Sequence, residues 1–96
     1  MPRFYRTRSS HLLLVNPPPD PATLAAQAAA VLGLPAVVMG QPLIDRRTGA
    51  TVTLLALDNW QGLLEACVKD PSTPNPAGIP GLDNYWMKVT ELQPTP

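Results

Sequence analysis

Proline sets the strongest limit on how this chain can fold. Thirteen of its 96 residues are proline, and proline has no backbone N–H to donate to a helix or a sheet. Regular elements must therefore lie between prolines or begin at one of them. The stretch 71–84, PSTPNPAGIPGLDN, is too rich in proline and glycine for a regular element. We expect a long loop there, and loops of this length inside compact domains are usually functional or disordered.

Two stretches carry helix signals. In DPATLAAQAAAVLG, Asp20 is placed to cap the helix, a proline occupies the first helical position and Gly33 can close the end, which predicts a helix over 21–32. In LDNWQGLLEACVKDP, apolar residues recur at helical spacing between an aspartate and a proline, which predicts a second helix over 59–69. Gly62 weakens this second helix by roughly 1 kcal/mol relative to alanine.

Apolar or alternating runs predict four strands, at 10–16, 36–44, 50–57 and 84–92. The second and third are separated by DRRTG, a polar turn sequence that predicts a hairpin. Pro42 lies in the second strand and cannot donate to a ladder, so this strand should be at a sheet edge.

The predicted order is strand, helix, strand, strand, helix, strand. A right-handed crossover and a central hairpin favour a single α+β domain with a ferredoxin-like, two-layer arrangement, in which both helices cover one face of a four-stranded antiparallel sheet. The competing arrangement is a meander with the helices at one end. The domain should span 10–92, between an N-terminal arm at 1–9 and a short tail at 93–96.

The core follows from the apolar stripes of these elements. The first helix should bury Leu24, Ala28, Val31 and Leu32. The second helix and the sheet should bury Trp60, Leu63, Leu64 and Val68 together with Leu13, Val15, Val52 and Leu54.

Composition indicates a packed, soluble globule. Apolar residues make up 45% of the chain and charged residues 15%, whereas disordered chains are polar and highly charged. The apolar run after the first arginines ends too soon for a secretory signal, and no run reaches the roughly 20 apolar residues that cross a bilayer. We expect a cytoplasmic protein, or one held within a virion or another assembly, that is not exported by a signal peptide.

Charge is uneven along the chain although it sums to zero. Residues 1–50 hold five arginines against two aspartates, and residues 51–96 hold two lysines against five acids, so the halves carry about +3 and −3. Such asymmetry can orient subunits or steer a charged partner.

The sequence offers little for catalysis. Cys67 is the only cysteine and His11 the only histidine, so no disulfide within the chain and no zinc site made of cysteine and histidine can form. Cys67 falls on the apolar stripe of the predicted second helix, where a thiol behaves as a small apolar group. His11 stands beside two serines, but strand alternation would turn neighbours to opposite faces. We expect no enzyme activity, no catalytic residues, no metal and no cofactor.

The N-terminal MPRFYRTR favours one of two binding roles. Arginines with interleaved aromatics can bind single-stranded nucleic acid by neutralising phosphate and stacking bases, and Arg46 with Arg47 would form a second basic cluster. Against this, the chain has no net positive charge and its predicted central strands carry no aromatic residue. Arginine and tyrosine are also enriched at protein interfaces, and an extended arm can pair with a partner's sheet edge.

The sequence therefore predicts a non-catalytic protein-interaction module. We expect a structural subunit of an assembly, possibly a homo-oligomer, or an inhibitor of a partner protein, and its composition suits a phage or mobile-element product. A small nucleic-acid-binding protein is the alternative. The residues expected to contact the partner lie in the arm, the hairpin turn, the proline-rich loop and the last strand: Arg3, Phe4, Tyr5, Arg6, Arg8, Arg46, Arg47, Pro74, Pro76, Ile79, Pro80, Tyr85 and Trp86.

Overall fold

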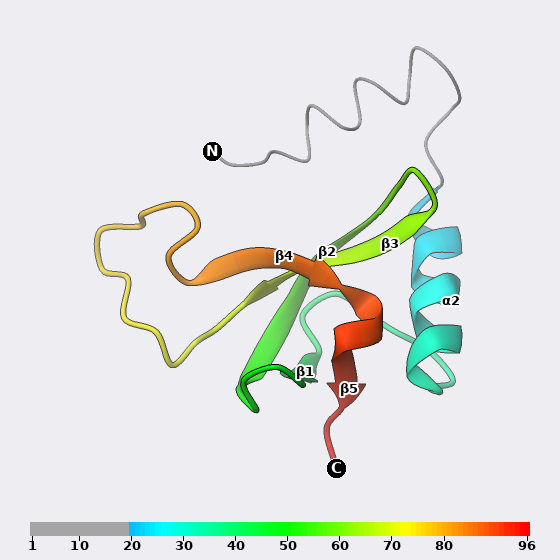
Figure 1. Cartoon of the computed structure of the whole chain (residues 1–96), viewed down its shortest axis with the longest axis horizontal. Coiled ribbons are helices and arrows are strands. Elements are labelled where there is room, and N and C mark those ends of the chain that lie inside the picture. The colour runs from blue at the N-terminus through cyan, green and yellow to red at the C-terminus, as the bar shows by residue number, and fades with distance from the viewer. Residues whose placement is uncertain (1–19) are drawn as a thin grey trace.

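The computed structural model describes residues 20–96, which form one helix and a five-stranded antiparallel sheet (Figure 1). The predicted strand at 10–16, the arm at 1–9 and the core residues Leu13 and Val15 lie outside the described residues. The elements, in chain order, are α2 (Pro21–Leu32), β1 (Pro42–Asp45), β2 (Thr51–Trp60), β3 (Leu63–Lys69), β4 (Asn84–Lys88), a 3-10 turn η1 (Val89–Glu91) and β5 (Leu92–Pro94).

The helix α2 is confirmed with the predicted bounds because its end signals are local. The Asp20 side chain accepts a hydrogen bond from the backbone N–H of Thr23 at 2.8 Å, and Gly33 closes the helix in the left-handed conformation, with φ of 71°. Its inner face differs from the expected one at two positions: Ala29 is buried, and Val31, which was expected to be buried, is exposed.

The predicted helix over 59–69 is wrong, because this stretch is the end of β2, a tight turn and β3. Gln61 and Gly62 both have positive φ, 54° and 84°, which is the geometry of a two-residue hairpin turn whose twist matches the strands on either side. A helix cannot pass through two such residues. The sequence Gln-Gly was therefore a turn signal rather than a weak point in a helix.

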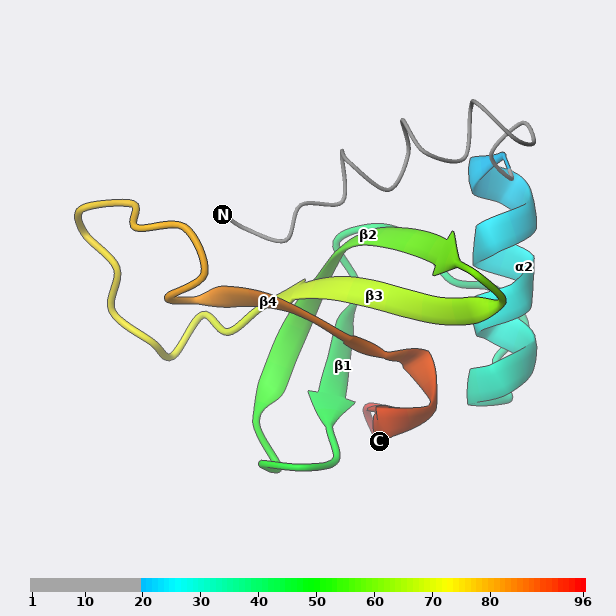
Figure 2. The ribbon, with the colours of Figure 1, turned by 45° about the horizontal axis from the view of Figure 1, so that its top comes forward.

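The sheet has the order β4-β3-β2-β1-β5, so neither the four-stranded count nor the ferredoxin-like order is confirmed. The strand expected at 84–92 is divided into β4 and β5, which lie at opposite edges of the sheet and are joined by three residues. Five flat strands span about 19 Å at about 4.8 Å each, and three residues and their links reach at most about 14 Å. The sheet must therefore roll until its edges approach, as Figure 2 shows.

Pro42 is not on an edge strand, contrary to expectation, because β1 lies between β2 and β5. It is tolerated because it is the first residue of β1 and lies beyond the part of the strand that pairs with β5, which starts at Leu43. The strand expected to begin at residue 36 is correspondingly short.

The core lies between α2 and the concave side of the rolled sheet, as the buried cluster of helix, strand and η1 residues shows. Val52, Leu54 and Val68 are buried as predicted, and Leu64 packs partly against them. Trp60 is half-buried and Leu63 exposed, because side chains alternate between faces along a strand instead of sharing one stripe. Within residues 20–96, no helix has the length and apolar character that a bilayer crossing requires.

Candidate functional site

The most organised polar group in the described part of the chain surrounds Asp45, the last residue of β1. Its side chain is fully buried and accepts hydrogen bonds from the backbone N–H of Arg47 at 2.9 Å, from Arg47 Nε at 3.1 Å and Nη2 at 2.9 Å, and from the Tyr85 hydroxyl at 2.9 Å. The Arg47 guanidinium also lies 5.7 Å from the centre of the Tyr85 ring. We call Asp45, Arg47 and Tyr85 the Asp45 cluster.

The electrostatics of the Asp45 cluster favour a charged carboxylate beside a neutral phenol. The hydrogen bonds from the Arg47 side chain hold the pKa of Asp45 below its usual value, and Asp45 in turn raises the pKa of Arg47. Burial, and then the hydrogen bond to Asp45, raise the pKa of Tyr85 to about 12. At neutral pH the cluster is an ion pair with a hydrogen-bond donor, and none of its groups is poised to exchange a proton.

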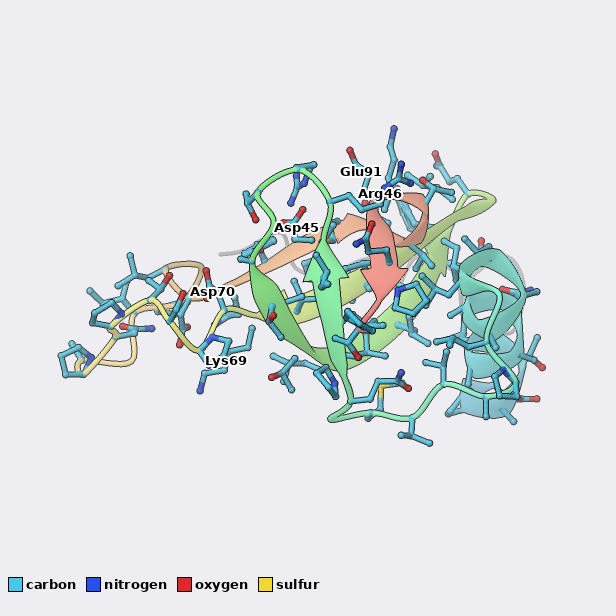
Figure 3. The ribbon with its side chains drawn as sticks, turned by 90° about the horizontal axis from the view of Figure 1, so that it is seen from below. Asp45, Arg46, Lys69, Asp70 and Glu91 are labelled. Carbon is cyan, nitrogen blue, oxygen red and sulfur yellow. The ribbon has the colours of Figure 1, made fainter. Side chains whose placement is uncertain are left out.

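Arg46 and Arg47 flank a shallow hollow of about 290 Å³, lined also by Thr90 and Glu91. Arg46 Nη1 donates to the carbonyl of Thr90 at 3.2 Å, and the Arg46 backbone N–H donates to the carbonyl of Glu91 at 2.9 Å. Figure 3 shows Arg46 and Glu91 together at this end of the sheet, near Asp45. The arginines of the hairpin turn thus attach it to η1 and to Asp45, and the nearby Glu91 opposes binding of an anion in the hollow.

The loop between β3 and β4 (residues 70–83), called here the β3–β4 loop, extends away from the sheet (Figures 1 and 2). Asn75 braces it: its side-chain amide donates to the carbonyl of Ile79 and to the carboxylate of Asp83, both at 3.0 Å, and its side-chain oxygen accepts from the Ile79 N–H at 2.8 Å. The Asn75 hydrogen bond is the main cause that holds the pKa of Asp83 below its usual value.

The base of the β3–β4 loop and its returning stretch at 79–82 differ in character. At the base, the backbone N–H and the hydroxyl of Ser72 donate to the Asp70 carboxylate, at 2.9 and 2.6 Å. Lys69 Nζ lies 3.9 Å from Asp83 Oδ2. Figure 3 labels Lys69 and Asp70 at this base. On the side of the loop that returns to β4, residues 79–82, Ile79 and Leu82 are 52% and 48% exposed. The loop thus combines a polar, hydrogen-bonded base with an exposed apolar stretch at 79–82.

The structure brings only some of the expected contact residues together. Pro74, Pro76, Ile79 and Pro80 share the β3–β4 loop, and all four are exposed. Arg47 and Tyr85 meet in the Asp45 cluster, where they contact each other and Asp45.

The remaining expected contact residues are placed differently. Trp86 is half-buried and points to the opposite face of the sheet from Tyr85, as strand alternation requires. Arg3, Phe4, Tyr5, Arg6 and Arg8 lie outside the described residues.

Sequence reasoning missed three residues that organise these regions: Asp45, Asn75 and Asp83. Asp45 carried one signal, an acid at the end of an apolar strand and directly before a turn, where aspartate caps backbone amides. Asn75 lies between two prolines, which is also a turn signal. Asp83 gave no signal, because its partners Asn75 and Lys69 are set by the path of the loop.

The residues weighed for chemistry are not assembled into a site in residues 20–96. Cys67 lies half-buried on β3 and not on a helix stripe as expected, and His11 is outside the described residues. In the same part of the chain, no three His, Cys, Asp or Glu side chains are grouped so that they could hold a metal ion.

Comparisons of the chain with protein-family models, with curated proteins and with solved structures found no match.

Proposed function

We propose that this domain is a non-catalytic protein-interaction module, a subunit of an assembly or an inhibitor of a partner protein, which contacts its partner through the apolar stretch 79–82 of the β3–β4 loop. The observation that carries the proposal is the combination of exposed Ile79 and Leu82 with a loop held in shape by Asn75 and Asp83. A loop that served only to join β3 to β4 would need neither the length nor the internal bracing.

The bracing supports binding because it lowers the cost of ordering. A mobile loop loses about 0.5–1.5 kcal/mol for each side chain that it immobilises on a partner. Four prolines in the loop restrict the backbone before any contact is made. Two hydrogen bonds of Asn75 fix the turn over 75–79, and the third ties this turn to Asp83. Apolar side chains on such a frame can be buried by a partner with little further entropy loss.

The nucleic-acid alternative has no support from residues 20–96. This part of the chain holds four Lys and Arg against seven Asp and Glu, a net charge of −3, whereas a nucleic-acid surface is basic. Arg47 is paired with Asp45, and Lys69 lies near Asp83. A basic binding surface would therefore have to be supplied by the arm at 1–9.

Aspartate substitutions in the stretch 79–82 test the proposal. Tagged full-length protein, cross-linked in its source cell, should capture a discrete protein or a second copy of itself. Ile79→Asp and Leu82→Asp should lose that capture, because each places an unpaired charge in an apolar contact. Val38→Asp is the matched control, since Val38 is 62% exposed but lies in the loop between α2 and β1.

Two outcomes would count against the proposal. One is capture that survives both loop substitutions, and the other is equal loss in Val38→Asp. Molar mass by light scattering on the same variants distinguishes self-association from binding of another protein.

A further inference from the structure

The three strands β2, β3 and β4 have two unlike faces. Ala66 and Val68 of β3 point into the core, so Glu65 and Cys67 point the other way. The strand register adds the residues paired with them, so this second face, called here the outer face, consists of Ala56, Asp58, Trp60, Leu63, Glu65, Cys67, Trp86 and Lys88. The helix α2 packs against the core face, through Ala28, Ala29 and Leu32.

The outer face has the composition of a contact surface. Two tryptophans lie on it, and both are half-buried. In the register Glu65 lies between Asp58 of β2, a like charge that destabilises the sheet, and Lys88 of β4, an opposite charge that offsets part of that repulsion. Glu65 is only 7% exposed, and Asp58 Oδ2 is buried without a hydrogen-bond partner. A buried carboxylate oxygen without a donor is costly, so this face favours a cationic, hydrogen-bonding cover with apolar parts.

Residues 1–19 of the same chain have that chemistry. They contain three arginines and no acidic residue, a net charge of +3, which balances the −3 of residues 20–96. They also contain Phe4, Tyr5 and the apolar run Leu12–Val15. The outer face itself carries Asp58 and Glu65 against Lys88, a net charge of −1. The segment can therefore supply hydrogen-bond donors for Asp58 and apolar side chains for the two tryptophans.

The point of attachment also fits. Residue 19 is joined to Asp20, the cap of α2, and the first half of α2 lies beside the β2–β3 turn (Figures 1 and 2). The Asn59 side chain of β2 also donates a long hydrogen bond of 3.4 Å to Gln27 Oε1 of α2 there. Trp60 and Leu63 flank the turn, so the segment starts at one end of the outer face. Nineteen residues reach up to about 60 Å, more than twice the roughly 23 Å length of the seven-residue β3.

We propose that residues 1–19 dock on the outer face of their own domain, with arginines of MPRFYRTR donating to Asp58 and Glu65 and apolar residues covering Trp60 and Trp86. The arm then completes the domain instead of projecting toward a partner. This inference does not depend on the proposed role of the β3–β4 loop, which is a separate surface.

A spin label on the arm tests the docking in the full chain. The label is attached in Ser9→Cys with Cys67→Ala, which leaves one thiol, and amide and indole signals are compared before and after the nitroxide is reduced. Signals of Asp58 and Glu65 and the indole N–H of Trp60 and Trp86 should lose most of their intensity, while Ile79 keeps its own. Broadening confined to the first turn of α2, or spread evenly over the domain, overturns the proposal.

Two further samples separate the remaining possibilities. Mixing labelled protein of natural isotope content with unlabelled ¹⁵N protein should give no broadening; broadening in that mixture shows that the arm of a second copy occupies the face, which overturns docking within one chain. Asp58→Asn should reduce the broadening in the labelled chain, and so should salt at about 0.5 M, where the Debye length falls below about 5 Å. Glu91→Gln, an acid on η1, is the control and should leave the broadening unchanged.

Discussion

The hydrogen bond from the Tyr85 hydroxyl to Asp45 gives the sharpest test of the fold, because it joins two strands that are not adjacent in the sheet, β1 and β4. Tyr85→Phe removes this bond and keeps the ring that packs on the core. A hydrogen bond to a charged group contributes about 1.5–3 kcal/mol. Since Asp45 Oδ2 keeps its hydrogen bond from Arg47 Nη2 when the hydroxyl is removed, we expect a loss near the lower limit, about 1.5 kcal/mol.

Chemical and thermal unfolding measure this loss. In a domain of this size 1 kcal/mol corresponds to roughly 4–8 °C, so the unfolding midpoint should fall by about 6–12 °C. Urea unfolding followed by tryptophan fluorescence should give the same free energy with an unchanged slope. Thr90→Ala, at an exposed position in η1, is the control. A loss below about 0.5 kcal/mol, the size of ordinary surface substitutions, would show that Tyr85 does not hold β1 to β4.

Three other perturbations follow from the same geometry. The pKa of Asp45 is lowered by Arg47, so the stability that this pair contributes is present above about pH 4 and is lost as the pH falls through the lower folded-state pKa. In urea unfolding from pH 5 to pH 2, the free energy of unfolding should therefore fall less in Asp45→Asn than in the wild type. Gly62→Ala should destabilise the protein by about 1 kcal/mol because φ is 84° there, whereas in a helix the same change would stabilise it by about that amount, so the sign of the change in urea midpoint decides. Asn75→Ala should speed hydrogen exchange at the Ile79 amide, which donates to Asn75, while Ser72→Ala at the loop base should not; equal rates in wild type and Asn75→Ala would contradict the bracing.

The elements that sequence predicted correctly are those with local signals. Asp20, Pro21 and Gly33 mark the two ends of α2 within one short stretch, and each acts where it stands. The second helix failed because Leu64 and Val68 are four residues apart, which suits one side of a helix, yet they also share a face of β3, since every second residue of a strand does. Gln61 and Gly62 were the residues that separated these two interpretations.

The strand order and the candidate site were beyond local pattern. Asp45 and Tyr85 are 40 residues apart, and their contact depends on how the sheet rolls. The last predicted strand is divided into β4 and β5 by η1, in which Val89 is buried in the core. A continuous strand would instead have stayed at one edge of the sheet. The class, α+β, followed from the mixture of signals, but the closure of the sheet did not.

The short link between β4 and β5 has a consequence for the order in which the domain forms. The β2–β3 hairpin needs only two turn residues, and such hairpins form in about 1–10 μs. The pairing of β1 with β5 instead joins residues that are about 50 positions apart, such as Leu43 and Pro94, so its loop-closure entropy is large. As the chain leaves the ribosome, β1 has β2 on one side long before β5 exists on the other, and until residues 92–94 emerge its outer backbone groups remain open to any other extended chain.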